Sequence, residues 1–555
     1  MMRLGVRAML VAGMVMSAGL LSACGDDDPT GPNNPPPTGV TATAGSATAV
    51  TLSFQPVQGA TDYVIQRAAG TATFTVVDTI QTTTFQDTGL QPATQYRYQV
   101  ASIAGGRMGF FGPELAVSTL AAGRGAATID ADITANRTLF ADTVYTLRGF
   151  VKVASGATLT IQPGTRIQGD FNTVGSSLFI LRGARIVARG TRENPIVFTS
   201  SRPAASALPG DWGGVIIVGR GVINRASPVI LEGTENFPQP INYAGGTDNA
   251  DNSGELRYVR IEFAGYATQP NAELNTLTLA AVGSGTVIEY VQAANGLDDS
   301  FEWFGGAVDG RYLVSYEAGD DHFDASEGYV GRNQFLIALQ TKVPTTRPEA
   351  GAAASDPQGI ENDGCAGSSG CPNGELSTPF TIPMFANFTL VGTGRTNTSG
   401  GEVGMVLRRG TGGFYVNGIV TRWGRAAISM RNTTTQARVT AGDLVVRNVL
   451  LAQNGVAFEA GTDRFSVDAA ANAIESSAAT ATSLFTALPA APTQASELNW
   501  SLSAASPART GGLSAFTGAM ATKAGTFVTA TAYRGAADPA ATTSWWDGWT
   551  RYYAK

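Results

Sequence analysis

The chain has 555 residues, of which only 15% are charged, compared with about 25% in typical globular proteins. Its formal net charge is −7, and residues 296–331 alone hold nine acidic residues against a single arginine, Arg311. Nothing in this sequence offers the basic surface that phosphate binding needs, which excludes nucleic acid as a partner. The low charge and the abundance of Gly, Ala and Thr are typical of an extracellular, β-rich protein.

The N-terminus has the three zones of a secretory signal. Two early arginines precede an apolar segment at 8–21, and small residues lead up to Cys24. This segment is shorter than the span of about 20 apolar residues that a membrane-crossing helix needs. The sequence LSAC at 21–24 resembles the lipobox of bacterial lipoproteins, and the resemblance implies cleavage before Cys24 and lipidation of its sulfur. We therefore expect a signal peptide at 1–23 and a lipid anchor at Cys24.

Residues 24–37 predict a Pro-rich, extended tether, because they cannot bury apolar surface. The residue after Cys24 is Gly25 rather than Asp, so the best-known retention signal for the inner membrane is missing. The acidic run at 26–28 resembles export tags that send some lipoproteins to the outer cell surface. A solvated linker is the alternative. We expect a lipid-anchored protein of the outer membrane, displayed at the cell surface.

Residues 38–120 consist of short alternating runs, such as DYVIQRA and YRYQVAS, separated by turns. This period-two pattern predicts a β-sandwich. The segments GATDY at 59–63 and TGLQP at 88–92 resemble a fibronectin type III domain. In that resemblance Tyr96 is the corner tyrosine, and Phe54 stands where the family usually has tryptophan. Such domains are spacers or binding modules, and we interpret this one as a spacer.

From residue 128 onward, strand-like pieces such as ELRYVRIEFAG and GDLVVRNVLLAQNG recur, at roughly the period of a solenoid. Strands flanked by Gly, Asn and Asp turns predict a right-handed parallel β-helix over 128–475. A second sandwich would need tight hairpins, which these segments lack. The expected fold class is all-β: a fibronectin type III-like sandwich followed by a pectate-lyase-like solenoid.

The solenoid contains GDWGGVIIVGR, then DDSFEWFGG followed one repeat later by GDDHFD, and GIEND at 359–363. These motifs resemble a family of secreted β-helix proteins of Gram-negative bacteria. The resemblance implies the fold but no activity. Members of that family often read GDDDFD, so His322 replaces the last acid of the triplet, which argues against an obligatory ligand at this position.

Residues 476–555 are rich in Ala, Ser and Thr and end in WWDGWT at 545–550. A solenoid needs its last rung covered, so we expect this segment to form a C-terminal cap. A surface aromatic strip that stacks sugars is the alternative.

Two acidic segments, at 298–302 and 320–324, align with a shift of 22 residues. Equivalent positions in neighbouring rungs of a β-helix lie about 4.8 Å apart, so carboxylates would stack on carboxylates and Phe301 on Phe323. Stacked like charges repel unless something neutralises them, and Ca²⁺, which accepts six to eight oxygens, suits this task. Capping of turn amides without metal is the alternative. The candidate calcium ligands are Asp298, Asp299, Glu302, Asp320, Asp321 and Asp324.

The three cysteines agree with a lipoprotein that is exported to an oxidising compartment. Cys24 takes lipid, which leaves Cys365 and Cys371 to form a disulfide in an oxidising compartment. The one histidine, His322, is remote in sequence, which argues against a zinc enzyme.

Catalysis by the acidic segments has two known patterns among β-helix enzymes that cut acidic polysaccharides. Paired aspartates would suit a hydrolase, but the GHG and RIK companions of polygalacturonases are absent from this sequence. A lyase would need calcium and a basic residue, and no spacing selects one. The candidate bases are Arg311, Arg332, Lys342, Arg408 and Arg409.

The interpretation favoured by these patterns is a non-catalytic cell-surface protein for binding or adhesion, which presents a β-helix face to glycans or partner proteins. A calcium-dependent lyase acting on uronate-containing polymers is the alternative, and a purely architectural role is a third. Trp303, Tyr316 and Trp423 are candidates for stacking a ligand, with core packing as the competing interpretation.

Overall fold

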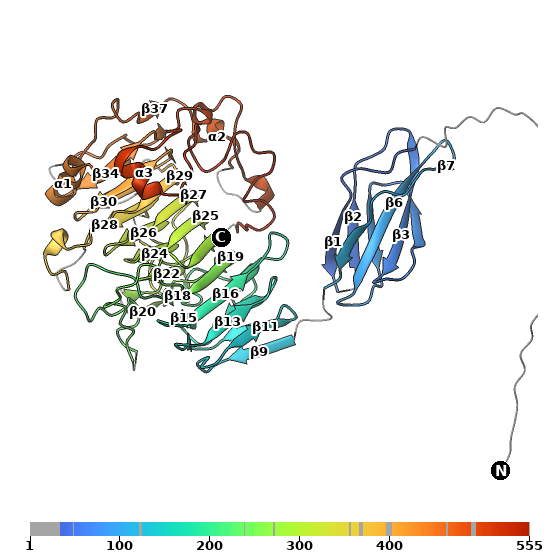
Figure 1. Ribbon diagram of the computed structural model, residues 1–555, viewed down its shortest axis with the longest axis horizontal. Helices are drawn as coiled ribbons and strands as arrows, with labels where there is room; N and C mark the ends of the chain where they lie inside the picture. The colour runs from blue at the N-terminus through green and yellow to red at the C-terminus, as the bar shows by residue number, and fades with distance from the viewer. Residues whose placement is uncertain are drawn as a thin grey trace, which may run out of the picture. The chain divides into compact units, whose positions relative to one another are not determined.

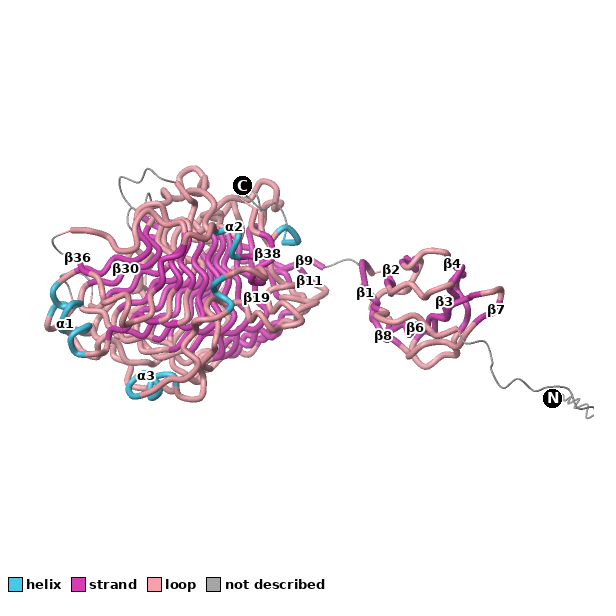
Figure 2. The backbone as a smooth tube through the Cα atoms, turned by 90° about the horizontal axis from the view of Figure 1, so that it is seen from above, coloured by secondary structure: helices cyan, strands magenta, loops and turns pink. Residues whose placement is uncertain are grey.

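The computed structural model describes most of the chain after the tether. It covers residues 34–120 and 125–553, apart from 48, 238, 270–271, 355–356, 366–369, 396–401, 462–463 and 490–494. The chain divides into two compact units between residues 123 and 124, and both units are built mainly from strands (Figures 1 and 2). Cys24 and the expected signal peptide lie outside the described residues. Within them, no helix combines the length and apolar character that crossing a membrane requires.

The first unit is a sandwich of two antiparallel sheets. One sheet contains β1 (Thr41–Ser46), β2 (Ala49–Ser53) and β5 (Thr84–Thr88). The other contains β4 (Thr75–Ile80), β3 (Ala60–Ala69), β6 (Gln95–Ala104), β7 (Arg107–Met108) and β8 (Leu115–Ser118). The Tyr96 hydroxyl accepts a hydrogen bond from the backbone N–H of Gln91 at 2.9 Å, as a corner tyrosine does. Phe54 is buried against Tyr63, so this core tolerates Phe in place of Trp.

The second unit is a parallel β-helix with two long sheets, as predicted (Figure 1). The ten-stranded sheet runs through β12 (Phe150–Val153), β15 (Ser177–Ile180), β18 (Gly214–Val218), β22 (Leu277–Ala280), β24 (Phe301–Phe304), β26 (Phe323–Ser326), β28 (Ile360–Asp363), β30 (Val403–Arg408), β33 (Ala426–Arg431) and β36 (Arg464–Phe465). Its neighbours pair in parallel except for β33 and β36. Apolar side chains that alternate along each strand fill the interior.

The second sheet has 17 strands and forms the other wall. It contains β9 (Gly125–Ile129), β10 (Arg137–Leu139), β11 (Thr143–Leu147), β13 (Thr158–Ile161), β14 (Arg166–Gly169), β16 (Arg185–Arg189), β17 (Ile196–Ser200), β19 (Gly254–Glu262), β23 (Val287–Ala294), β25 (Asp309–Tyr316), β27 (Arg332–Leu339), β29 (Met384–Val391), β31 (Gly413–Val416), β32 (Ile419–Thr421), β34 (Leu444–Arg447), β35 (Leu450–Ala452) and β37 (Glu475–Ser477). Smaller elements decorate this frame: hairpins β20 (Ala267–Gln269) with β21 (Ala272–Glu273) and β38 (Phe485–Ala487) with β39 (Asn499–Leu502), and helices α1 (Thr433–Ala441), α2 (Ala481–Leu484) and α3 (Gly518–Ala524).

One residue in each of several rungs bends the second wall. These residues adopt a left-handed backbone conformation and stack from rung to rung; they are Tyr258, Tyr290, Tyr312, Phe335, Asn387, Asn417 and Asn448. The ring centroids of the four aromatic residues are 4.4, 4.4 and 5.1 Å apart in succession. We call this series the aromatic–asparagine ladder. Its attractive ring contacts and the hydrogen bonds donated by its asparagine amides offset an unfavourable backbone conformation.

The C-terminal segment covers the outer side of this ladder. Asn387 and Asn417 donate to Thr531, and the Trp549 ring meets the rings of Tyr258 and Tyr290 edge-on. The segment predicted at 476–555 therefore packs along many rungs rather than as a cap over the last one. The reason is the apolar outer face of the second wall, where buried residues from β23 to β35 contact the C-terminal side chains. Trp549 is fully buried, so it is also not part of an exposed strip.

Candidate metal centre

The predicted acidic residues lie on the outer face of the ten-stranded sheet, in β24 and β26, and in the turns that lead into these two strands. Glu302 in β24 is paired in register with Asp324 in β26, and Asp324 with Glu361 in β28. Phe301 and Phe323 point the other way and stack in the interior with ring centroids 5.4 Å apart. The 22-residue shift therefore predicts the register of this wall, because alternate residues of a strand face opposite sides.

Two of the acids also hold the turns between rungs together. The backbone N–H of Asp321 donates to Asp299 Oδ1 at 2.8 Å, and that of Gln358 donates to Asp321 Oδ1 at 2.6 Å. In the rung before, Asn275 Oδ1 accepts from the N–H of Asp299 at 3.2 Å. Capping of amides thus occupies one oxygen of Asp299 and one of Asp321.

The carboxylate oxygens gather into three groups that share members. Within each group, one oxygen per residue lies within 4.8 Å of the others; the groups are Asp298, Asp299 and Asp320; Asp299, Glu302 and Asp324; and Asp321, Asp324 and Glu361. Asp299 joins the first group to the second, and Asp324 joins the second to the third. We call these seven residues the acidic centre. It contains all six ligands predicted from the sequence, together with Glu361.

Burial makes the negative charge of the acidic centre costly. It raises the pKa of Asp298, Asp299, Glu302, Asp321 and Asp324 well above the usual values, and the neighbouring carboxylates raise these pKa values further. The same causes raise the pKa of Glu361 to about 7. Asp324 Oδ1 is buried and accepts no hydrogen bond from the described residues. A cation bound here would remove these penalties at once, because it attracts every one of the carboxylates.

A further acid comes from an insertion that sequence reasoning missed. Glu232, in the long segment after β18, has its pKa raised to about 8 by burial and then by Glu273. Its charge in turn raises the pKa of Asp298. Residues 219–253 have no counterpart in the repeat, so no sequence register could place Glu232 here.

Arginines neutralise one end of the acidic centre. Arg408 pairs with Glu361 and, through Nε at 2.8 Å, with Asp363. Arg409 also pairs with Asp363, at 2.5 Å. Burial lowers the pKa of Arg408, but the charges of Asp363 and Glu361 raise it by more, to above its usual value. A guanidinium held this firmly in its charged form is a poor base.

The other candidate bases lie away from the acidic centre or do not contact it. Arg311 and Arg332 are in β25 and β27 of the second wall, where Arg311 donates to the backbone oxygen of Phe527 and Arg332 pairs with Asp309. Lys342 lies near Glu317, where burial raises the pKa of Glu317 to about 7 and the charge of Lys342 only partly offsets this rise. Only Arg408 and Arg409 of the five predicted bases pair with acids on this wall.

His322 belongs to the interior. Its Nδ1 lies 2.5 Å from the Ser315 hydroxyl, and its ring meets that of Trp423 edge-on. Burial lowers its pKa to about 3, which keeps the ring neutral. Because the ring is fully enclosed, this serine–histidine pair cannot meet a substrate, in agreement with the prediction that the position is not a ligand.

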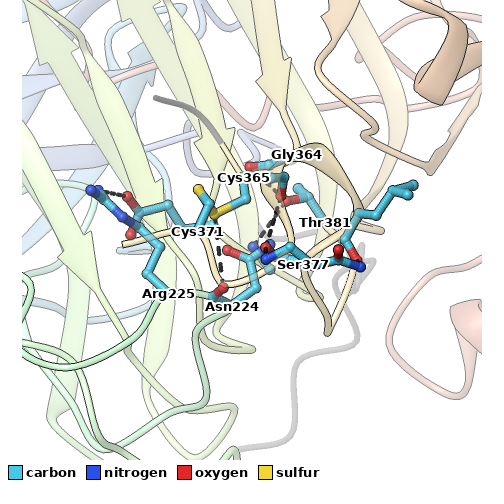
Figure 3. Close-up of a disulfide and its surroundings, with 12 residues drawn as sticks. Asn224, Arg225, Gly364, Cys365, Cys371, Ser377 and Thr381 are labelled. Carbon is cyan, nitrogen blue, oxygen red and sulfur yellow. Dashed lines mark hydrogen bonds and ion pairs between the residues drawn. A yellow bond between two sulfur atoms is a disulfide. The ribbon is translucent and has the colours of Figure 1, made fainter. Parts of the chain in front are cut away.

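The disulfide predicted between Cys365 and Cys371 is formed and closes a small loop beside the segment that follows β18 (Figure 3). Cys365 Sγ lies 3.8 Å from the backbone oxygen of Asn224. The N–H of Ala226 donates to the oxygen of Gly370 at 2.7 Å. Between these contacts, Arg225 reaches Glu327 at 2.5 Å. The loop that the disulfide closes therefore contacts the segment that continues to Glu232.

The three candidate stacking residues are buried. Trp303, Tyr316 and Trp423 are 1%, 2% and 0% exposed. Trp303 faces the interior, Tyr316 packs under the C-terminal segment, and Trp423 Nε1 donates to the backbone oxygen of Leu390. The prediction that they stack a ligand is wrong, since the competing interpretation, core packing, holds for all three.

A groove of about 730 Å³ lies on the edge of the solenoid beside α3. It is lined by residues in or next to the turns that precede β25, β27 and β29, by Phe414 in β31 and by charged side chains. The charged residues are Asp309, Arg332, Asp443 and Lys523. Because rungs repeat every 4.8 Å or so, a groove that crosses several of them is suited to an extended chain.

The β-helix matches a family described as "Pectate-lyase like beta helix domain" over residues 131–500, which is 370 of the 555 residues. The chain belongs to this family. Residues 35–117 match the fibronectin type III domain family. The matched range contains the acidic centre and most of the groove lining, whereas Ala519, Thr522 and Lys523 of the groove lie beyond it.

Solved structures similar to this chain include fibronectin type III domains. The FN5 domain of Drosophila Lar is 29% identical, with 16% of this chain and 96% of that chain covered and a TM-score of 0.14. A Fn3-like protein from Clostridium thermocellum is 27% identical, with 15% and 90% covered and a TM-score of 0.14. A comparison with curated proteins found no match.

Proposed function

We propose that this protein is a non-catalytic lipoprotein of the cell surface, anchored in the outer membrane through Cys24, whose β-helix binds a glycan or a partner protein. In this proposal Ca²⁺ occupies the acidic centre and stiffens the wall. The lipobox at 21–24 supports the anchor. The combination of a fibronectin type III domain with a pectate-lyase-like β-helix supports a surface or carbohydrate-related role.

The observation that carries the calcium proposal is the linked arrangement of the carboxylates. Asp299 and Asp324 each belong to two oxygen groups, and Asp324 Oδ1 has no hydrogen-bond donor among the described residues. The donors are all oxygens, which hard cations prefer, and Ca²⁺ tolerates irregular geometry better than Mg²⁺. The capping interpretation accounts for one oxygen each of Asp299 and Asp321, but not for Asp324.

Thermal unfolding of the chain from Gly25 onward, titrated with CaCl₂ and then with chelator, tests this proposal. A ligand that binds only the folded state raises stability with its concentration, so we expect a reversible rise in Tm. Asp324→Asn should abolish most of the rise. Glu193→Gln is the matched control, since Glu193 is an exposed acid in the turn between β16 and β17. Equal calcium responses in both variants would refute the site.

The groove beside α3 is the best candidate for the glycan or partner. Its lining, in which Asp309, Arg332, Asp443 and Lys523 stand beside apolar side chains, can hydrogen-bond hydroxyl, carboxylate or amide groups. Binding to arrayed acidic and neutral glycans should be lost in Lys523→Glu and kept in a control that changes another exposed cation of the C-terminal segment, Arg551→Glu. Binding that is unchanged in Lys523→Glu would place the ligand elsewhere.

The lyase alternative is favoured by one observation, the presence of Arg408 and Arg409 beside the acidic centre. It predicts unsaturated product from pectate or alginate in the presence of calcium, lost in Arg408→Ala. We expect no product from the unaltered chain, because Arg408 is held as a cation by Glu361 and Asp363. Calcium-dependent product that disappears in Arg408→Ala would replace the binding proposal with the lyase.

A further inference from the structure

The fibronectin type III unit has two exposed apolar side chains, Met108 and Phe110, that lie outside its hydrophobic core. β6 and β7 form a hairpin, and Met108 at its end and Phe110 just after it are 49% and 76% exposed. Phe110 is the most exposed of the large apolar side chains in the described residues. Scattered exposed apolar residues are common, so the location of this pair decides whether it has a role.

The hairpin lies where the chain enters from the tether. Asn34 Nδ2 donates to the backbone oxygens of Arg107, at 2.6 Å, and Ala104, at 3.2 Å. The Ser102 hydroxyl donates to the oxygen of Pro35 at 2.9 Å. The first described residues are therefore hydrogen-bonded along this hairpin.

The sequence places the anchor close by. Nine residues lie between Cys24 and Asn34, and the ten steps from one Cα to the next span at most about 36 Å when fully extended. A tether this short keeps the hairpin at a high effective concentration near the surface that holds the lipid. Arg107, exposed at the same hairpin, forms no ion pair with any described carboxylate, so its charge is available to anionic headgroups.

We propose that Met108 and Phe110 form a membrane-contacting tip that enters the headgroup region of the membrane to which Cys24 is attached. Apolar side chains flanked by a cation suit this interface, because the apolar groups leave water while the charge stays at the headgroups. The tip would set the fibronectin type III unit upright on the bilayer. This inference rests on the lipid anchor of the proposed function but not on calcium or on the groove.

The test places an environment-sensitive fluorophore at the tip of the lipidated, full-length mature protein. Phe110→Cys carries the probe, with the disulfide of Cys365 and Cys371 left oxidised. Val76→Cys is the matched control, because Val76 is 60% exposed on β4, at the opposite edge of the sheet from β7. Both proteins are reconstituted into vesicles of phosphatidylethanolamine and phosphatidylglycerol that contain a lipid-borne quencher.

We expect the probe at 110 to shift to shorter wavelength and to lose most of its emission to the quencher, and the probe at 76 to keep its emission. Equal emission at both positions in vesicle-bound protein would overturn the membrane-contacting tip and leave the lipoprotein proposal intact. Failure of the Cys24 protein to acquire acyl chains and enter vesicles would overturn both. Shielding of the probe at 110 without any lipid would overturn the tip in favour of a protein contact.

Discussion

The acidic centre and the aromatic–asparagine ladder are both stacks of like side chains in successive rungs, yet their energetics are opposite. In the ladder, Tyr290 and Tyr312 attract each other through ring contacts at 4.4 Å, and Asn417 finds partners in the C-terminal segment. In the acidic centre, Glu302 and Asp324 repel each other at the same repeat. Stacking of like side chains in successive rungs thus stabilises or destabilises the folded chain, depending on their chemistry. A stack of carboxylates destabilises the folded chain unless a cation neutralises it, so the acidic centre indicates a bound cation.

The largest expected effect on the free energy of unfolding comes from removing a ring from the aromatic–asparagine ladder. Tyr312→Ala removes one ring from between two neighbours and leaves a left-handed alanine. We expect a loss of about 3 kcal/mol in the free energy of unfolding, as for large-to-small changes of aromatic residues. The loss should be the same with and without calcium in urea titrations. A calcium-dependent loss would mean that the two stacks are coupled.

Calcium itself should have the next largest effect, on the acidic centre alone. At a free concentration of about 100 times Kd, a ligand specific for the folded state adds roughly 2.7 kcal/mol. The stabilisation should persist in Tyr312→Ala and vanish in the double variant Asp299→Asn, Asp324→Asn, which removes both shared carboxylates. Retention of the stabilisation in the double variant would exclude the acidic centre as the binding site.

The pH dependence of the free energy of unfolding should come from the acidic centre and not from the aromatic–asparagine ladder. Because the carboxyl pKa values are raised, reaching about 7 for Glu361 and about 8 for Glu232, the folded chain holds protons that the unfolded chain has released. Without calcium, the free energy of unfolding should therefore fall as the pH rises from about 5 to about 8. A carboxyl group whose pKa is one unit higher in the folded chain contributes about 1.4 kcal/mol to this fall. Calcium displaces these protons, so its stabilisation should be larger at the higher pH. Calorimetry at both pH values, with and without chelator, measures this difference, and an equal calcium effect would contradict it.

The smallest expected effect concerns the amide half of the ladder. Asn387→Ala removes hydrogen bonds to Thr531 and Gly535 of the C-terminal segment and places an alanine in a left-handed conformation. A loss of about 1 to 2 kcal/mol is expected. Proteolysis near residue 531 should become faster, because the segment is held less firmly. Unchanged proteolysis would mean that apolar packing alone holds the segment.

The sequence predicts local and repeated features well. The 22-residue shift between the two acidic segments predicts the register of Phe301 with Phe323 and the grouping of all six acids. The reason is that equivalent positions of successive rungs lie next to each other in a β-helix. The sandwich follows from alternation and turns, and the corner tyrosine Tyr96 follows from the resemblance to fibronectin type III domains. These features depend only on contacts between neighbouring strands. The sequence shows them because the repeat period and the alternation of apolar and polar residues can be read directly from it.

Tertiary structure decided what surrounds those features. Glu232 and Arg408 reach the acidic centre from an insertion and from another rung, and burial, which no pattern reports, raises the carboxyl pKa values. Trp303 and Trp423 face the core, and the C-terminal segment runs along the second wall because that wall has an apolar outer face to cover. Such contacts join residues separated by tens to hundreds of positions with no shared period, so only the folded chain specifies them.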